Sequence, residues 1–215
     1  QDQTGARGHK RQYRVARMRV LVVGAVRMSF ACETPRNGAA ALFAVALQGH
    51  LPTLATARLL LRAPRVTDFD IYAQIACTSR GAHLGGPMGR EEAWLDFSQM
   101  TSTWLLHGHG LWTIGHAGGI AGFVVLGFEP GDQEPELGFM LTKQAEGRGI
   151  AFEAASAALT HACNTLGWAT LVSYIAPDNA RSIALARRLG GLPDGVITED
   201  GETTLIYRYT REVLQ

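Results

Sequence analysis

A glycine-rich turn in the second half of the chain has the composition of an anion-binding loop. It reads Glu146-Gly147-Arg148-Gly149 and joins an expected strand at 136–141 to an alanine-rich expected helix at about 150–166. Because glycine has no Cβ, backbone N–H groups at such a turn can approach an anion closely, beside the positive end of the helix dipole. The turn therefore predicts a phosphate site, although a tight connection without a ligand explains it equally well. Neither a P-loop nor a complete G-x-G-x-x-G pattern is present.

The elements around this turn alternate between strands and helices of one domain. At 215 residues the chain is long enough for one α/β domain with a sizeable core and too short for two large domains. Hydrophobic periodicity and turn residues predict strands at 58–62, 111–116, 120–128, 136–141, 169–175, 196–198 and 203–209. Helices are expected at 39–48, 67–77, 91–106, 150–166 and 179–189.

Composition excludes several classes of protein. With 47% hydrophobic and 18% charged residues, the chain is neither disordered nor collagen-like, and no apolar run approaches the length of a membrane span. Three cysteines without a C-x-x-C pair offer neither a disulfide framework nor zinc ligands. We therefore expect a soluble, cytoplasmic protein without a metal ion.

The N-terminal region differs from the remainder in charge. Residues 1–27 hold seven of the 20 Lys and Arg against one acid, which leaves 13 basic and 18 acidic residues, a net charge of −5, in 28–215. An acidic body argues against nucleic-acid binding and suits an amine-bearing substrate. We expect an extension over 1–50, basic and disordered to about residue 27 with a short helix over 39–48, followed by the domain at 51–215. The apolar stretch 20–26 mimics a signal peptide or a dinucleotide-binding strand but is too short for the first and lacks the glycines of the second.

Three segments resemble, in order, the motifs of one enzyme family. Residues 144–151 (QAEGRGIA) match the Q-x-x-G-x-G/A pyrophosphate loop of the GNAT superfamily of acyl-CoA-dependent N-acyltransferases. Residues 179–190 contain its later N-x-x-[AS] and L-G segments, and 56–62 (TARLLLR) resemble the T-x-R-L-x-L-R first strand of the RimJ/RimL-like branch, named for ribosomal-protein N-terminal acetyltransferases. The joint resemblance spans about 51–210.

The resemblance implies an acetyl-CoA-dependent enzyme with the acyl-CoA N-acyltransferase fold. This is a mixed α/β (α+β) domain with a mostly antiparallel sheet of six or seven strands and helices on both faces. The sheet splays between 136–141 and 169–175, and the pantetheine arm of the cofactor bonds there like an extra strand, without a metal. The implied cofactor contacts are the backbone of Phe139, Met140 and Leu141, the loop residues Gly147, Arg148, Gly149, Ile150 and Ala151, and the side chains of Asn179 and Ser182.

The sequence departs from the family pattern where a general acid is usual. Many members have a tyrosine seven residues after the Asn and an aromatic residue after Leu-Gly, where this chain has Ala186 and Gly191. Ser182 and Tyr174 are the remaining candidates for protonating the CoA thiolate. Their alternative roles are a hydroxyl at a helix N-terminus and a half-buried strand aromatic.

Glu136 is the best-placed general base. An amine nucleophile with a pKa near 10 has to lose a proton before it attacks, and a carboxylate can accept that proton. Alternation along 136–141 puts Glu136 on the face of Gly138 and Met140, opposite Leu137, Phe139 and Leu141, so it can face a cleft. The alternative is a solvated carboxylate in an acidic loop.

The predicted reaction is direct transfer of an acetyl group from acetyl-CoA to a primary amine, with the oxyanion held by a backbone N–H near Met140. A protein N-terminus, a polyamine, an aminoglycoside and an amino acid all remain as acceptors. A non-catalytic CoA-binding sensor of the same fold and a nucleotide-binding module on residues 19–28 are the alternatives. We expect no nucleic-acid or membrane partner, and either a monomer or a homodimer.

Overall fold

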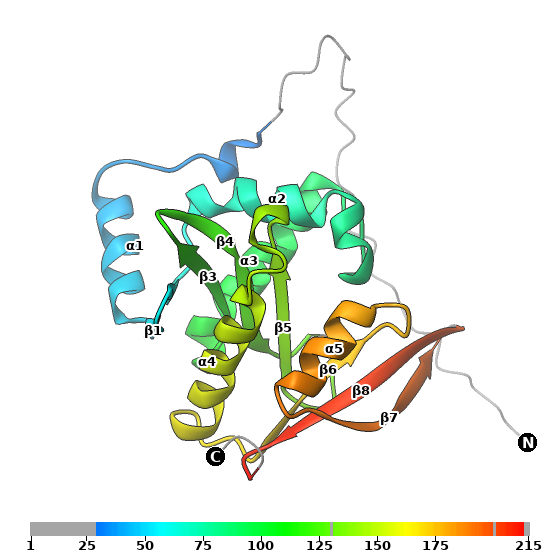
Figure 1. The fold of residues 1–215 in the computed structure, drawn as a ribbon. Helices are drawn as coiled ribbons and strands as arrows, with labels where there is room; N and C mark the ends of the chain where they lie inside the picture. The colour runs from blue at the N-terminus through cyan, green and yellow to red at the C-terminus, as the bar shows by residue number, and fades with distance from the viewer. Residues whose placement is uncertain (1–28, 130, 200, 213–215) are drawn as a thin grey trace, which may run out of the picture.

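The computed structural model describes residues 29–129, 131–199 and 201–212. The basic stretch 1–27 and the apolar stretch 20–26 lie outside these residues. One eight-stranded sheet runs through the domain in the order β1-β2-β3-β4-β5-β6-β8-β7, and only β5 and β6 pair in parallel (Figure 1). The strands are β1 (Leu54–Ala55), β2 (Leu59–Arg62), β3 (Leu111–His116), β4 (Gly119–Gly127), β5 (Glu136–Leu141), β6 (Thr170–Ile175), β7 (Leu192–Glu199) and β8 (Glu202–Thr210).

The mostly antiparallel architecture predicted from the sequence is confirmed, with eight strands instead of six or seven. The additional strand is β1, whose two residues are too short to carry a period-two pattern. Five α-helices occur in the described ranges: α1 (Ala39–His50), α2 (Phe69–Ala76), α3 (Arg90–His107), α4 (Ile150–Asn164) and α5 (Ala180–Arg188). Four 3₁₀ turns accompany them: η1 (Ala31–Glu33), η2 (Val66–Asp68), η3 (Ser79–His83) and η4 (Lys143–Ala145).

Helices cover both faces of the sheet, and each face has its own core. On one face α4 and α5 pack through small and aliphatic residues such as Ala155, Ala158 and Leu185. On the other face α2 and α3 pack with an aromatic cluster that includes Phe69 and Phe97. Because successive strand residues point to opposite faces, β5 sends Leu137, Phe139 and Leu141 to the first core and Met140 to the second.

The first Arg of the TARLLLR segment connects the β1–β2 hairpin to α4. The Arg58 guanidinium lies 2.7 Å from Glu153 on α4 and donates a 3.0 Å hydrogen bond to the carbonyl oxygen of Arg148. Thr56 donates its hydroxyl proton to the same Glu153 carboxylate. This end of the sheet therefore supports the glycine turn from outside.

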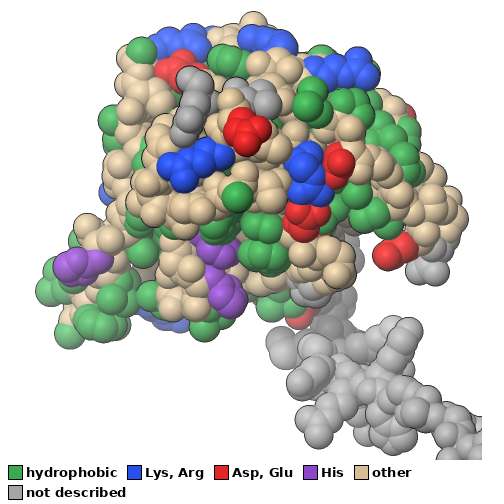
Figure 2. Space-filling model, turned by 90° about the horizontal axis from the view of Figure 1, so that it is seen from below, with side chains coloured by type: hydrophobic (Ala, Val, Ile, Leu, Met, Phe, Trp, Pro, Cys, Tyr) green, Lys and Arg blue, Asp and Glu red, His purple; other side chains and the backbone are tan. Residues whose placement is uncertain are grey.

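Helix α1 stands apart from both cores. None of its residues is buried, and Leu42, Phe43 and Val45 are more than 60% exposed. Figure 2 shows hydrophobic side chains gathered on a lobe at the lower left, where α1 projects from the domain. Among the helices of the described ranges, none is both long and apolar enough to cross a membrane.

Candidate active site

Strands β5 and β6 lie side by side at one point and then separate. Their only paired residues are Glu136 and Val172, and the Val172 N–H donates to the carbonyl of Pro135 at 2.9 Å. One residue further, the Ser173 hydroxyl donates to the carbonyl of Leu137 at 2.7 Å. Beyond Leu137, no strand of the described residues pairs with β5 on this side, so the sheet splays as the resemblance implies.

Alternation decides which backbone groups of β5 face the splay. The carbonyls of Pro135 and Leu137 point to β6, so the N–H and C=O groups of Phe139 and Leu141 face the same way. The Met140 backbone instead faces β4, where Met140 is paired with Phe123. Phe139 and Leu141 therefore provide the free edge. A cofactor contact of the Met140 backbone and an oxyanion held by a backbone N–H near Met140 stay predictions.

The glycine turn adopts the conformation expected of an anion cradle. Gly147 and Gly149 have φ angles of +69° and +76°, which glycine adopts without steric cost. The N–H groups of residues 148–152 donate to no acceptor in the described part of the chain, because Gly149 caps α4 without a side chain. A free strand edge followed by unpaired N–H groups fits a pantetheine arm ending in a diphosphate.

We expect Gly149→Ala to weaken CoA binding by about tenfold, which is about 1.4 kcal/mol. An added Cβ would lie 3.4 Å from the Arg58 guanidinium and would strain the positive φ, so the N–H groups of the cradle would turn away from the anion. Calorimetric titration with CoA measures the effect. Arg148→Ala should be milder, because the loop is expected to bind through its backbone.

Gly167→Ala is the matched control for this prediction. Gly167 has nearly the same φ, +73°, with open space around its Cα, and lies at the opposite end of α4. Both substitutions should cost roughly 1 kcal/mol of folding stability, and only Gly149→Ala should change the CoA affinity. If Gly149→Ala binds CoA normally and Arg148→Ala does not bind it, the loop binds the diphosphate through the Arg148 side chain and not through its backbone N–H groups.

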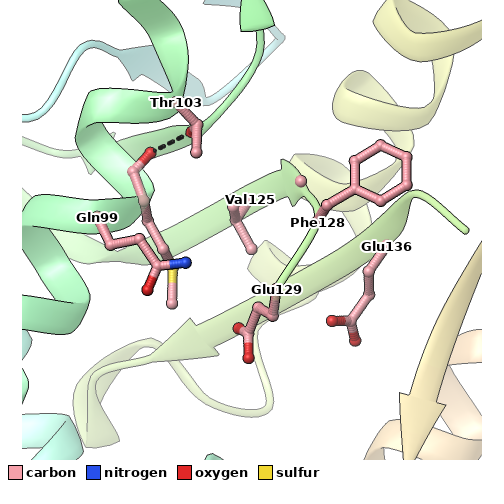
Figure 3. A pocket seen from close by; sticks show the side chains of 8 residues that line it. Gln99, Thr103, Val125, Phe128, Glu129 and Glu136 are labelled. Atoms are coloured by element: carbon pink, nitrogen blue, oxygen red, sulfur yellow. Dashed lines mark hydrogen bonds between the residues drawn. The ribbon is translucent and has the colours of Figure 1, made fainter. Parts of the chain in front are cut away.

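Glu136 lies where the two strands separate, at the edge of a depression between α3 and the β4–β5 connection. Figure 3 shows Gln99 reaching in from α3, while Glu129 and Glu136 come from the end of β4 and from β5. The lining also includes Thr103, Val125 and Phe128. Removal from water raises the pKa of Glu136 to about 8, and the negative charges of Glu129 and Asp132 act in the same direction. One hydrogen bond, from the Tyr174 N–H at 3.3 Å, opposes this shift.

The candidate acids lie on the other wall of the splay. Tyr174 is on β6, half-buried, and burial together with the nearby Asp132 charge raises the pKa of its hydroxyl. Asn179 caps α5, since its side-chain oxygen accepts a 3.2 Å hydrogen bond from the Ser182 N–H. The Ser182 hydroxyl has no partner within the described ranges. Asn179 and Ser182 thus have a structural role at the helix N-terminus, and a cofactor contact stays a prediction for both.

The two departures from the family pattern have steric reasons. Ala186 lies on the buried face of α5 and is 1% exposed, so a tyrosine would not fit there. A Cβ at Gly191 would lie 2.8 Å from the ring of Tyr209 and 2.9 Å from the carbonyl oxygen of Ala186. The buried Tyr209 therefore occupies the space into which a side chain at 191 would point.

The ring side chains of Trp104, His109 and Trp112 belong to the core. The flanking glycines at 108 and 110 predict a solvated turn for His107 and His109. His107 is exposed, but His109 is 6% exposed and donates from Nδ1 to the Leu126 carbonyl at 2.9 Å. Trp104 and Trp112 pack edge to face, with ring centroids 4.6 Å apart, in the core. No His, Cys, Asp or Glu cluster in the described ranges has the arrangement of a metal site.

Sequence reasoning missed the residues that brace the glycine turn. Arg58 and Glu153 hold it from the β2 side, and Arg80 reaches Glu146 from η3. Arg58 lies in the TARLLLR segment, so the resemblance marked the residue without its role. Arg80 carries no pattern signal, because its partners are 61 and 66 positions away.

Comparisons with known proteins agree with this geometry. Residues 58–191 match the family model described as acetyltransferase (GNAT) domain. A search of curated proteins finds no match. A crystal structure of an acetyltransferase from Agrobacterium tumefaciens is similar at 38% identity with a TM-score of 0.70, covering 75% of this chain and 95% of that one.

Two structures of ribosomal-protein acetyltransferase type share the fold at lower identity. RimL, a ribosomal L7/L12 alpha-N-protein acetyltransferase in complex with CoA, is 19% identical with a TM-score of 0.64, covering 75% of this chain and 99% of that one. Mycobacterium smegmatis RimJ in complex with CoA-disulfide is 18% identical with a TM-score of 0.62, covering 76% and 90%. With the family match over most of the domain, these comparisons and the splayed sheet lead to one conclusion: the chain belongs to the GNAT acetyltransferase family.

Proposed function

We propose that this protein is an acetyl-CoA-dependent N-acetyltransferase that acetylates a primary amine by direct attack, with Glu136 as general base. The observation that carries the proposal is the position of this carboxylate. It lies where β5 and β6 separate and lines the depression between α3 and the β4–β5 connection. Its pKa of about 8 suits a base that exchanges protons near neutral pH.

The cofactor side of the site would be held by backbone groups. Phe139 and Leu141 offer N–H and C=O groups to the pantetheine arm, and the N–H groups at 148–151 lie where a diphosphate would follow. When bound, acetyl-CoA supplies an acetyl group activated as a thioester. The role of the chain is to fix this arm along β5, so that its reactive end lies toward Glu136.

The acceptor side favours a cation. Glu129 and Glu136 line the depression, and burial raises the pKa of both, as it does for the nearby Asp132. Repulsion by the charge of Asp132 raises the pKa of Glu129 and of Glu136 further. An ammonium group entering among them would relieve this repulsion and would release its proton to Glu136 before the amine attacks. RimL is named as acting on the α-amine of a ribosomal protein, which makes a protein N-terminus one acceptor to test.

Tyr174 is the proposed acid for the departing thiolate. A hydroxyl whose pKa is raised remains protonated over the working range and can donate a proton. Ser182 is the alternative, through its unpartnered hydroxyl or a bound water. Tyr174→Phe and Ser182→Ala, compared at saturating acetyl-CoA, separate the two candidates.

The buried Ala186 supports a second candidate, a CoA-binding sensor that has lost turnover. Release of free CoA thiol from acetyl-CoA distinguishes the two functions. The assay should include peptides beginning with Ser, Ala, Thr or Met, a polyamine, an aminoglycoside and free amino acids. Binding of acetyl-CoA without release of thiol in the presence of any of these amines would favour the sensor.

Acetyl-CoA is expected to raise the melting temperature of the protein, whereas ATP and NAD are not. At a concentration about 100 times its dissociation constant, a ligand that binds only the folded state adds about 2.7 kcal/mol, which corresponds to roughly 5–10 °C for a domain of this size. Differential scanning fluorimetry with each ligand measures the shift. Equal stabilisation by ATP would show that the cradle binds phosphates without recognising the pantetheine arm.

A further inference from the structure

The short η3 turn between α2 and α3 brings an arginine to the edge of the proposed cofactor site. The Arg80 Nη2 atom lies 2.7 Å from the carbonyl oxygen of Leu141 and 2.5 Å from a carboxylate oxygen of Glu146. Leu141 is the last residue of the free edge of β5, and Glu146 is the first residue of the glycine turn. Arg80 therefore lies between the predicted position of the pantetheine arm and that of the diphosphate.

The present contacts of Arg80, both made by Nη2, leave a buried donor of its guanidinium unpaired. Its Nε atom is buried and has no hydrogen-bond acceptor in the described part of the chain. A buried N–H without a partner costs about 1–3 kcal/mol, so an acceptor brought by a ligand would be favourable there. In addition, the Leu141 carbonyl that Arg80 contacts is one that a pantetheine amide would use.

Glu146 is surrounded by three cations, of which Arg80 is the least exposed. The Lys143 and Arg181 side chains lie 3.2 Å and 3.1 Å from Glu146 but are 72% and 80% exposed, whereas that of Arg80 is 26% exposed. Water and salt screen the two exposed charges strongly. Glu146 itself remains ionised, since hydrogen bonding with Arg80 lowers its pKa to about 2. Arg80 is thus held beside the unpaired N–H groups as a preoriented charge.

We propose that Arg80 is a phosphate-binding residue of the cofactor site. When CoA binds, Arg80 stays paired with Glu146, releases the Leu141 carbonyl to the pantetheine arm and turns its unused Nε–H to a diphosphate oxygen. The inference rests on the proposed function, because it takes CoA as the ligand. It assigns to η3, which lies outside the glycine loop, the task of distinguishing a phosphate-bearing cofactor from bare pantetheine.

The test compares CoA with pantetheine, which has the arm but no phosphate. Calorimetric titration should show CoA binding by Arg80→Gln weakened by about tenfold or more, as for loss of a charge-assisted hydrogen bond, and pantetheine binding changed by less than about threefold. Arg80→Lys keeps a positive charge without the Nε donor, so it should lie between Arg80→Gln and wild type. Arg181→Gln removes an exposed cation from the same carboxylate and should weaken CoA binding by less than about threefold.

Melting temperatures without ligand show whether each variant is folded. If Arg80→Gln does not fold, Arg80→Lys decides the test. In that case an Arg80→Lys variant that binds CoA as tightly as wild type overturns the proposal. Unchanged or tighter CoA binding by Arg80→Gln also overturns it, as does an equal loss for CoA and pantetheine, which would mean that Arg80 acts only on the β5 edge. A wild-type protein that does not bind CoA contradicts the proposed function itself. If wild type binds CoA and the Arg80 variants bind it with the same affinity, only the role of Arg80 is contradicted.

Discussion

Replacing Glu136 with glutamine is expected to lower kcat/KM for the acetylated amine by about 100-fold or more, the usual contribution of a general base. Glutamine keeps the size of the side chain but cannot accept the proton of an ammonium group. The wild-type to variant ratio of rates should rise with pH and level off above about pH 8, because Glu136 is protonated below its pKa of about 8. The ratio cancels the ionisation of the acceptor amine, which both proteins share.

Two measurements show whether Glu136→Gln lowers the rate of the acetyl transfer itself or impairs cofactor binding or folding. CoA affinity should be unchanged, because the free edge begins beyond Glu136. The pKa of Glu136 is higher in the folded protein than the ordinary value of 4.5, so its contribution to wild-type stability is lost as pH rises from about 4.5 through about 8. Glu136→Gln should therefore melt no lower than wild type at pH 9. A ratio that does not vary with pH would exclude Glu136, and the same comparison with Glu129→Gln would then test the neighbouring carboxylate.

Asp68→Ala is expected to destabilise the domain by about 3 kcal/mol, because it leaves a largely buried arginine without its partner. Asp68 is 2% exposed and accepts two hydrogen bonds from the Arg62 guanidinium, at 2.7 Å and 2.9 Å. It also accepts from the Thr113 hydroxyl at 2.7 Å and from the Arg65 N–H at 2.8 Å. The second Arg of the TARLLLR segment thus joins β2 to β3 and to the start of α2.

Urea unfolding should show a lower midpoint with an unchanged slope, as for a loss of stability without a change in compactness. Asp70→Ala is the matched control two residues away. Asp70 is 56% exposed and pairs at 2.7 Å with Arg90, which retains Glu33, so its loss should cost less than about 1 kcal/mol. If the two substitutions lower the free energy of unfolding equally, the Arg62–Asp68 pair stabilises the domain no more than a surface ion pair does.

The sequence alone determined the elements whose signals are local. Alternation along β5 correctly separated Glu136 and Met140 from Leu137 and Phe139, because the side-chain period of a strand is a property of the backbone. The positive φ angles of Gly147 and Gly149 follow from glycine in a tight turn. The order of elements also followed from such local signals, whereas the splay and the family followed from the resemblance of the three motif segments.

Only the tertiary structure decided how these elements face one another. In the register between β4 and β5, the Met140 backbone faces β4 and not the splay. The sequence of β5 alone does not determine this register, because it depends on the partner strand. Burial under β4 made His109 a core residue, and Tyr209 took the space beside Gly191. Arg58 and Arg80 brace the glycine turn from 90 and 66 positions away. Conformational preferences act over a few residues, whereas a hydrogen bond or a pKa depends on atoms brought close by folding, so the glycine turn was predictable and the charges around it were not.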